Sequence, residues 1–286
     1  MSTVKPIVVG TDGSAESLRA VEWAAREAAL RKAPLRIVSA AELLPRMVGP
    51  VGFSDVGNVA SVIKEGAVQS LDVAARRAAE LAPDVYIDTD LLTGPAAISV
   101  CDCGSGAQLL VVGSRGTGPF SAMVLGSVSR YTAIHAACPV VVVREETMAA
   151  HRQIVVGIRN VDDCDAALAF AFEEAGLRKA SLLAVHAWQA PYSSPEPGPD
   201  EAPSQHTVDA DAAEALAELL AMWRTKYPDV IVNQDIVHGH PGRVLAGLSA
   251  RADLVVLGRH GTNGVARVAH AVLSHAHGPV ATVPSA

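Results

Sequence analysis

The chain has 286 residues, enough for one large domain or two ordinary ones, each able to bury a core. Half of the residues are apolar, 19% are charged and the mean hydropathy is +0.27, values that favour strands buried on both faces and exclude a disordered chain. A net charge of −7 without a basic stripe argues against nucleic acid as a partner.

The N-terminal residues Met1–Pro6 lead directly into an apolar run and show no secretion signal. No apolar run is long enough to cross a bilayer. We therefore expect a cytoplasmic protein without membrane contact. We interpret the four cysteines as reduced, partly buried thiols, with a redox role as the alternative; they are Cys101, Cys103, Cys138 and Cys164.

Strand-length apolar runs alternate with helix-period stretches in the first half. The expected strands are Ile7–Gly10, Leu35–Ala40, Val85–Asp90, Leu109–Gly113 and Val140–Val143. The expected helices are Ser14–Arg31, roughly Val59–Leu81, Pro95–Gly104 and Ser127–Ala137. This alternation predicts a parallel sheet with helices on both faces, which binds ligands beyond the carboxyl ends of its strands, where the strand order reverses.

The chain repeats itself at a near-constant offset. Pro6–Gly10 recurs as Gln153–Gly157 after 147 residues, and Leu109–Gly116 recurs as Leu254–Gly261 after 145 residues. Two further pairs agree with these offsets: Thr93–Ala96 with His238–Gly242, and Ala137–Val141 with His277–Ala281. The pattern predicts a tandem duplication into domains 1–147 and 148–286, with the joint near 145–152.

A glycine motif follows the fourth expected strand. Gly113-Ser114-Arg115-Gly116 is separated by nine residues from Gly126-Ser127-Val128-Ser129. Glycines let backbone N–H groups approach an anion, and the helix that begins at this second segment offers unpaired N–H groups and a positive dipole end. Because two glycine pairs flank one loop, the loop is able to wrap a phosphate chain.

These residues resemble a known family. Val8–Ser14, together with the spacing of Gly113, Gly116 and Gly126-Ser127, is similar to the ATP-binding branch of the universal stress proteins, and the doubled chain resembles their tandem form. The resemblance covers nearly the whole chain. It implies two tandem doubly wound α/β domains, each a five-stranded parallel sheet whose first and fourth strands flank the switch point. It also implies dimerisation through Val140–Val143, either between chains as a homodimer or between the halves as a pseudo-dimer.

The resemblance also implies a site for ATP, with or without Mg²⁺. By position, Asp12 would contact the nucleoside and the Ala40 backbone would meet the adenine. The phosphates would be held by Gly113, Gly116, Gly126, Ser127, Val128 and Ser129. Because a carboxylate repels phosphate, we expect Asp12 at the ribose hydroxyls or at a bridging Mg²⁺. Helix capping is the alternative role of Asp12, Ser127 and Ser129, and Arg115 either pairs with phosphate or faces solvent.

The second half departs from this motif. Arg159 or Asn160 stands where the first half has its acidic residue, although Gly258 and Gly261 are retained. Alignment backwards from Pro279 matches His275 with His135 and places Ala266-Arg267 at the positions of Gly126-Ser127, with a loop five residues shorter. Arg267 offers a charge in place of hydroxyl contacts. The sequence therefore predicts one intact nucleotide motif and one degenerate copy.

Nine of the ten histidines lie in the second half. His238, His240 and His260 follow expected strands, so their imidazoles could meet at zinc or nickel. The histidine spacings do not match those of a four-ligand structural site, and no acidic ligand at a suitable spacing supports a catalytic one. We interpret them as polar loop and helix-end residues and expect no metal site.

The motifs of common nucleotide enzymes are absent from the sequence. The chain has no Gly-x-x-x-x-Gly-Lys-Ser/Thr loop, no dinucleotide fingerprint and no nucleophile elbow. Backbone amides bind ground states without positioning a nucleophile, so we expect at most slow ATP turnover. The first hypothesis is a nucleotide-dependent sensor of stress or energy state with an unidentified protein partner.

Two alternatives stay open. One is an enzyme of the adenine-nucleotide α-hydrolase group, which usually carries a Ser-Gly-Gly-x-Asp-Ser loop where this chain has Thr11–Ser14. The other is a scaffold with vestigial sites. Two proline-containing segments, Glu42–Gly57 and Ala190–Ser204, follow the second strand of each half and are candidate lids or plain linkers.

Overall fold

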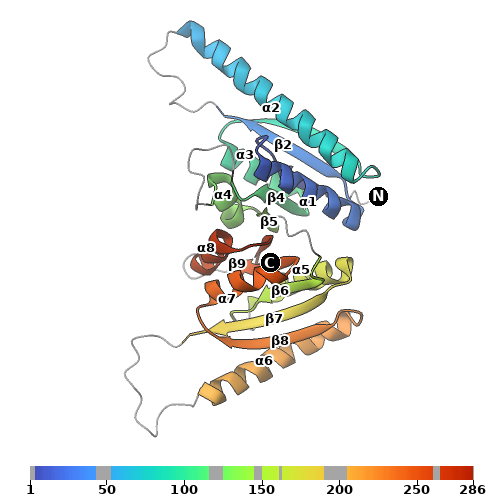
Figure 1. Ribbon diagram of the computed structural model, residues 1–286, viewed down its shortest axis with the longest axis vertical. Helices are drawn as coiled ribbons and strands as arrows, with labels where there is room; N and C mark the ends of the chain where they lie inside the picture. The colour runs from blue at the N-terminus through green and yellow to red at the C-terminus, as the bar shows by residue number, and fades with distance from the viewer. Residues whose placement is uncertain are drawn as a thin grey trace. The chain divides into compact units, whose positions relative to one another are not determined.

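The structure is a computed structural model that describes residues 4–42, 53–115, 125–144, 150–160, 163–189, 205–259 and 265–285. The chain divides into two compact units, Met1–Glu146 (the first unit) and Thr147–Ala286 (the second unit). Each unit is an α/β domain built on a parallel sheet with helices on both faces (Figure 1). The predicted fold class is confirmed.

The first unit has the strand order β3-β2-β1-β4-β5, and the described neighbours pair in parallel. Its strands are β1 (Ile7–Gly10), β2 (Leu35–Ala41), β3 (Ile87–Thr93), β4 (Leu109–Gly113) and β5 (Val140–Val143). The chain passes from β1 outward to β3 and then returns to the other side of β1 with β4. The carboxyl ends of β1 and β4 therefore form the switch point at which ligands of such sheets bind.

The described α-helices that cover this sheet are α1 (Ala15–Arg31), α2 (Phe53–Leu81), α3 (Ala96–Asp102) and α4 (Ser127–His135). A 3₁₀ turn at Cys103–Gly106 continues α3. Helix α1 packs beside α2, and α3 packs beside α4 (Figure 1). Both faces of the central strands are thereby covered, and β1, β4 and β5 consist almost entirely of buried Val, Ile and Leu.

Helix α1 shows how local sequence sets an element's bounds. Ser14 is the N-cap and accepts a hydrogen bond from the backbone N–H of Ser17. Lys32 ends the helix in the left-handed conformation, with φ of 51°, and its N–H reaches the carbonyls of the last turn. The buried stripe between these caps is rich in alanine, which allows the helix to approach the sheet closely.

The edge strand β3 is protected by charge. Arg36 on β2 donates to Asp90 on β3 at 2.6 Å, and Asp88 lies on the same strand. Charged side chains on an edge strand discourage pairing with a strand of another molecule.

The second unit repeats the arrangement, with the strand order β10-β9-β6-β7-β8. Its strands are β6 (Gln153–Gly157), β7 (Ser181–Trp188), β8 (Val232–His238), β9 (Leu254–Arg259) and β10 (Val280–Pro284). Its helices are α5 (Asp165–Arg178), α6 (Gln205–Lys226), α7 (Pro241–Leu248) and α8 (Val265–His275), with a 3₁₀ turn at Ser249–Arg251.

The duplication extends to a buried ion pair. Glu27 and Arg31 pair at the end of α1, and Glu174 and Arg178 pair at the end of α5, with both carboxylate side chains fully buried. Each pair is followed by a lysine in the left-handed conformation. The two domains therefore share one way of ending their first helix.

Some predicted boundaries were wrong. The third strand was predicted at Val85–Asp90, whereas β3 spans Ile87–Thr93, because the Val85 N–H bonds the Ala82 carbonyl in a turn. The helix α2 begins at Phe53, so the end of the candidate lid Glu42–Gly57 is helical. Residues 43–52 of that segment, and all of Ala190–Ser204, lie outside the described residues. Within the described residues, no helix is both long and apolar enough to span a membrane.

Candidate functional site

The predicted glycine motif lies where β4 ends and α4 begins. The Gly126 N–H donates to the carbonyl oxygen of Ser114 at 2.9 Å, and the Ser129 hydroxyl donates to the carbonyl oxygen of Gly113 at 2.6 Å. These two bonds join the end of the strand to the first turn of the helix. The structure therefore brings Gly113 together with Gly126 and Ser129.

Gly113 is required by the packing of α1 against β4. A Cβ atom at this position would lie 2.8 Å from the carbonyl oxygen of Glu16 and 3.0 Å from the backbone N of Ser17. Both atoms belong to the backbone of α1, so they cannot swing aside as a side chain would. The glycine lets the beginning of α1 lie directly against the end of β4.

Helices α1, α3 and α4 begin at this edge of the sheet, and their N-termini differ. Ser14 caps α1, and the Glu42 carboxylate accepts from the first N–H of α3, that of Ala96, at 3.1 Å. The N-cap residue of α4 is Gly126, which has no side chain to cap the helix. The first N–H bond within α4 is from Arg130 to Gly126, so no described group accepts from the N–H groups of Ser127, Val128 and Ser129.

Asp12 lies directly beyond β1 and is exposed. Its Oδ1 atom accepts from the Ser14 N–H at 3.1 Å and from the Ser14 hydroxyl at 2.6 Å. Both the capping role and the ligand role considered from the sequence are compatible with this geometry, because the carboxylate orients the start of α1 and still faces solvent.

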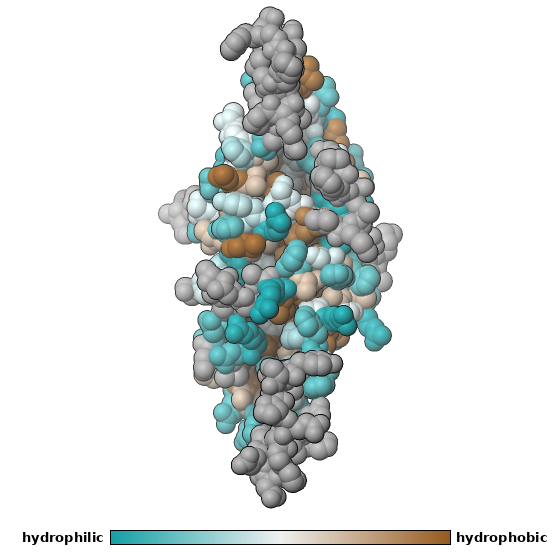
Figure 2. Space-filling model, turned by 90° about the vertical axis from the view of Figure 1, so that its left-hand side faces the viewer, coloured by the Kyte–Doolittle hydropathy of each residue, from teal (hydrophilic) through white to brown (hydrophobic). Residues whose placement is uncertain are grey.

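The other predicted residues have different surroundings. Ser127 is exposed, whereas Ser129 is buried with its hydroxyl on Gly113. Ala40 is half-buried on β2, opposite Leu92 of β3, and Arg115 is half-buried at the end of β4. Gly116 lies outside the described residues. Figure 2 shows a face of the molecule on which polar and apolar residues are interspersed.

Sequence analysis missed two hydroxyl residues that organise the site. The hydroxyls of Thr11 and Ser17, both buried, lie 3.0 Å apart. The Ser17 hydroxyl also accepts from the Asp12 N–H at 3.3 Å, and Thr11 accepts from the Gly13 N–H. Ser17 lies three residues after the N-cap Ser14, and a polar residue at that spacing is the signal that could have identified it.

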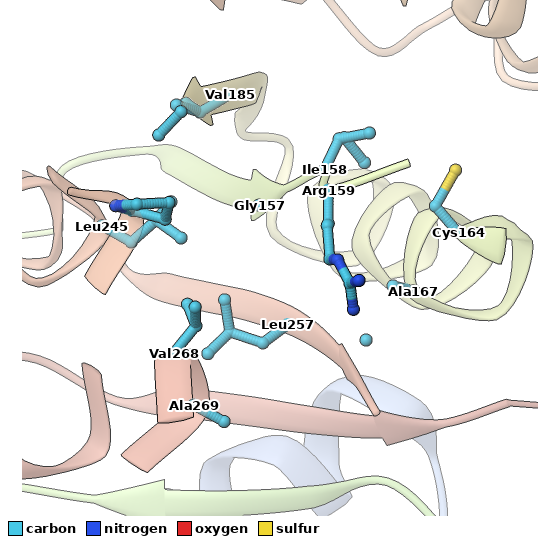
Figure 3. Close-up of a pocket in the computed structure, with 13 residues that line it drawn as sticks. Gly157, Ile158, Arg159, Cys164, Ala167, Val185, Leu245, Leu257, Val268 and Ala269 are labelled. Carbon is cyan, nitrogen blue, oxygen red and sulfur yellow. The ribbon is translucent and has the colours of Figure 1, made fainter. Parts of the chain in front are cut away.

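The second unit carries a pocket at the equivalent edge, with a free volume of about 80 Å³ (Figure 3). It is formed by the ends of β6, β7 and β9 together with α5, α7 and α8. Its lining residues are Gly157, Ile158, Arg159, Cys164, Ala167, Val185, Ala187, Pro241, Leu245, Leu257, Gly258, Val268 and Ala269. The predicted Gly258 belongs to this lining, and Gly261 lies outside the described residues.

The candidate metal histidines do not form a cluster in the described part of the chain. His238 lies edge-on against Trp188, with ring centroids 5.1 Å apart, and His240 is at the N-cap position of α7. His260 is outside the described residues. No group of three or more His, Cys, Asp or Glu side chains within the described ranges is placed to hold a metal ion.

Two tandem doubly wound domains, each with a switch-point edge, define the class of protein. The model of the universal stress protein family matches residues 3–144 and again residues 150–284. The chain therefore belongs to the universal stress protein family.

Tandem relatives match nearly the whole chain. Universal stress protein Rv2623 of Mycobacterium tuberculosis is 35% identical over 269 residues, which cover 91% of this chain and 88% of the relative. Rv2005c of the same organism is 33% identical over 284 residues, which cover 96% and 95%. A universal stress protein of Archaeoglobus fulgidus has a similar solved fold, with a TM-score of 0.71, 17% identity and 98% of each chain covered.

Proposed function

We propose that the first unit binds ATP at the carboxyl edge of its sheet and that the protein acts as a nucleotide-dependent sensor of stress or energy state. The observation that carries the proposal is the beginning of α4, where no described residue accepts from the first N–H groups of the helix. At the same edge the N-termini of α1 and α3 are capped by Ser14 and Glu42.

The phosphates would lie at the beginning of α4. The N–H groups of Ser127, Val128 and Ser129 have no acceptor among the described residues, and the exposed Ser127 hydroxyl adds a further donor. Gly126 adds no side chain between this turn and the residues that end β4. Gly116, across the loop, is proposed as a further phosphate contact.

The nucleoside would extend from this turn toward β1 and β2. The exposed Asp12 carboxylate suits ribose hydroxyls or a Mg²⁺ ion shared with the phosphates. The Ala40 backbone is the proposed contact for the adenine. The negative phosphates of the nucleotide would accept hydrogen bonds from the N–H groups at the beginning of α4. These donors would orient the nucleotide.

The chain's own groups favour binding over turnover. The phosphate donors are backbone amides and hydroxyls, and the sequence lacks the lysine of a P-loop. Donors of this kind stabilise a bound phosphate without activating a water or a hydroxyl for attack. The proposed output is therefore a change in the protein's geometry when the bound nucleotide changes.

Mass spectrometry of the small molecules released from the purified full-length protein tests the proposal. Intact ATP is the expected result. Release of AMP would instead support an α-hydrolase-like enzyme, and the absence of any nucleotide, together with no ATP binding in calorimetry, would support a scaffold.

A substitution at Gly126 tests the position of the site. A Cβ atom here would lie 3.4 Å from the nearest atom, the Cα of Arg115, so alanine fits the fold, whereas the branched side chain of Gly126→Val would press on Ser114 and Arg115 and displace the turn that begins α4. We expect Gly126→Val to weaken ATP binding at least about tenfold. The control is Gly106→Val, because Gly106 is exposed and a Cβ atom there meets nothing within 4 Å. Unchanged affinity of Gly126→Val would place the nucleotide elsewhere.

A further inference from the structure

The pocket of the second unit and the switch-point edge of the first unit occupy the same place in the repeat. The Thr11 N–H bonds the Val38 carbonyl, and the Ile158 N–H bonds the Val185 carbonyl, both at 2.8 Å. These bonds show that Ile158 is the equivalent of Thr11 in the repeat. Arg159 is therefore the equivalent of Asp12.

Two further matches fix the register of the helices. Arg31 and Arg178 end the first helix of each unit in equivalent ion pairs, which aligns Ser17 with Cys164. The ring Nδ1 atoms of His135 and His275 lie 2.9 Å and 2.8 Å from the carbonyl oxygen four residues earlier, which aligns Ser129 with Ala269.

The second unit lacks the three hydroxyl groups that line this edge in the first unit. The hydroxyls of Thr11, Ser17 and Ser129 are replaced by Ile158, Cys164 and Ala269, all of which line the pocket and are buried. A ribose needs hydrogen-bond partners for its hydroxyls, and this wall presents methyl groups and a thiol. The pocket therefore suits an apolar group better than a nucleoside.

The charged residue at this edge also has the opposite sign in the two units. Arg159 is the one charged residue among the lining residues that the structure describes, and it stands in place of Asp12. It is exposed and extends toward Ala167 of α5, while Leu245, Leu257 and Val268 lie at the opposite side of the pocket (Figure 3). A guanidinium is always protonated and binds a carboxylate through two parallel hydrogen bonds.

We propose that the second unit binds a small apolar acid, whose carboxylate pairs with Arg159 and whose hydrocarbon body fills the pocket against Ile158, Cys164 and Leu257. This site goes beyond the proposed function, because it takes a different ligand and shares no residue with the nucleotide site. A free volume of about 80 Å³ suits a short aliphatic chain or a single ring, with the acid group at the mouth.

Calorimetric titration of the full-length protein with butanoate, hexanoate, octanoate and benzoate tests the inference. We expect saturable binding of at least one of these acids, at one equivalent per chain. The uncharged amide of the same acid is expected to bind at least about tenfold more weakly, because it cannot form the charged pair.

Three variants locate the ligand. Arg159→Gln is expected to weaken acid binding at least about tenfold, whereas Arg251→Gln, at an exposed position outside the lining, is expected to have no effect. Ala187→Leu extends a half-buried lining side chain into the pocket and is expected to abolish binding of both the acid and its amide.

Several results would overturn the inference. They are no saturable binding of any of the four acids, equal affinity for acid and amide, and full affinity in Arg159→Gln. Displacement of the acid by ATP in the Gly126→Val background would show a second nucleotide site instead. Acid binding without any ATP binding would leave this inference standing while the proposed function fails, and ATP binding without acid binding would do the reverse.

Discussion

The hydroxyl of Ser129, in the first turn of α4, donates a 2.6 Å hydrogen bond to the carbonyl oxygen of Gly113, the last residue of β4. The side chain is buried, so this bond ties the proposed phosphate-binding turn to the sheet away from solvent. A residue that the sequence suggests as a phosphate contact thus holds the turn in place through its side chain, while no described residue accepts from its backbone N–H.

Ser129→Ala should therefore destabilise the first unit. The variant leaves the buried Gly113 carbonyl without its donor, which costs about 1–3 kcal/mol. Thermal unfolding followed by circular dichroism measures the loss. Ser105→Ala is the matched control, because the Ser105 hydroxyl also donates to a backbone carbonyl but is exposed, and we expect it to have little effect. Equal unfolding curves for the two variants would show that the Ser129 bond does not stabilise the fold.

Alanine substitutions at two glycines of the motif should destabilise the fold to different extents. Gly113→Ala forces a Cβ atom against the α1 backbone and should lower the free energy of unfolding by about 1–3 kcal/mol. Gly126→Ala meets only ordinary contacts and should lower it by less than about 1 kcal/mol, the scale of a helix N-cap change. Urea denaturation of both variants checks the order, and a larger loss in Gly126→Ala would contradict it.

Two substitutions at Asp12 should separate its capping role from a ligand role. Asp12→Asn keeps an Oδ1 acceptor for Ser14 but removes the charge, so we expect near-normal stability and weaker ATP binding in the presence of Mg²⁺. Asp12→Ala removes both the acceptor and the charge and should also lower stability by about 0.5–2 kcal/mol. Calorimetry with ATP and thermal unfolding measure the two effects. Normal ATP affinity in both variants would show that Asp12 caps α1 and does not contact the ligand.

The buried ion pair at the end of α1 should be strongly coupled. Arg31→Met leaves the buried Glu27 carboxylate without its guanidinium and should cost about 3–5 kcal/mol. The double variant Glu27→Met/Arg31→Met should recover most of this loss, because no charge is then left in the interior. The control Arg26→Met removes a half-exposed arginine whose pair with Glu22 spans 3.9 Å, and it should change stability by less than about 1 kcal/mol. Urea denaturation of all three variants tests the coupling, which additive losses would refute.

Cys103 should react with alkylating reagents only at elevated pH. Burial raises the pKa of the Cys103 thiol, and the neighbouring carboxylates of Asp90 and Asp102 raise it further, against the opposing effect of Arg36. Because the thiolate is the reactive form, its alkylation rate should rise at a higher pH than that of free cysteine. Peptide mass spectrometry after timed iodoacetamide treatment between about pH 7 and 10 measures the profile. A profile that matches free cysteine would disprove the effect of burial.

Much of the fold could be predicted because the central strands are continuous apolar runs that are easily recognised in the sequence. Runs such as Leu109–Gly113 and Val140–Val143 are buried on both faces, so they are apolar throughout and their bounds are exact to the residue. The edge strand β3 was harder to locate, because its Asp88 and Asp90 are polar and its length is set by pairing with β2.

The candidate site could be predicted only in part. The glycine spacing identified the junction of β4 and α4, because glycine is selected where two backbones meet closely. The hydroxyl pair of Thr11 and Ser17 was missed, since serine and threonine are common near any helix N-terminus. The apolar pocket of the second unit was also missed, because it depends on side chains such as Ile158 and Leu257 that lie far apart in the sequence.

The hydrogen bond from the Gly126 N–H to the Ser114 carbonyl closes the loop between them at its base. Because the ends of the loop are joined, its length should have little effect on the stability of the domain. Each doubling of a flexible loop costs only about 0.6 kcal/mol in chain entropy. We therefore expect insertions and deletions between these two residues to cost the domain little stability. The length and charge of this segment are thus free to diverge between relatives without rebuilding the domain.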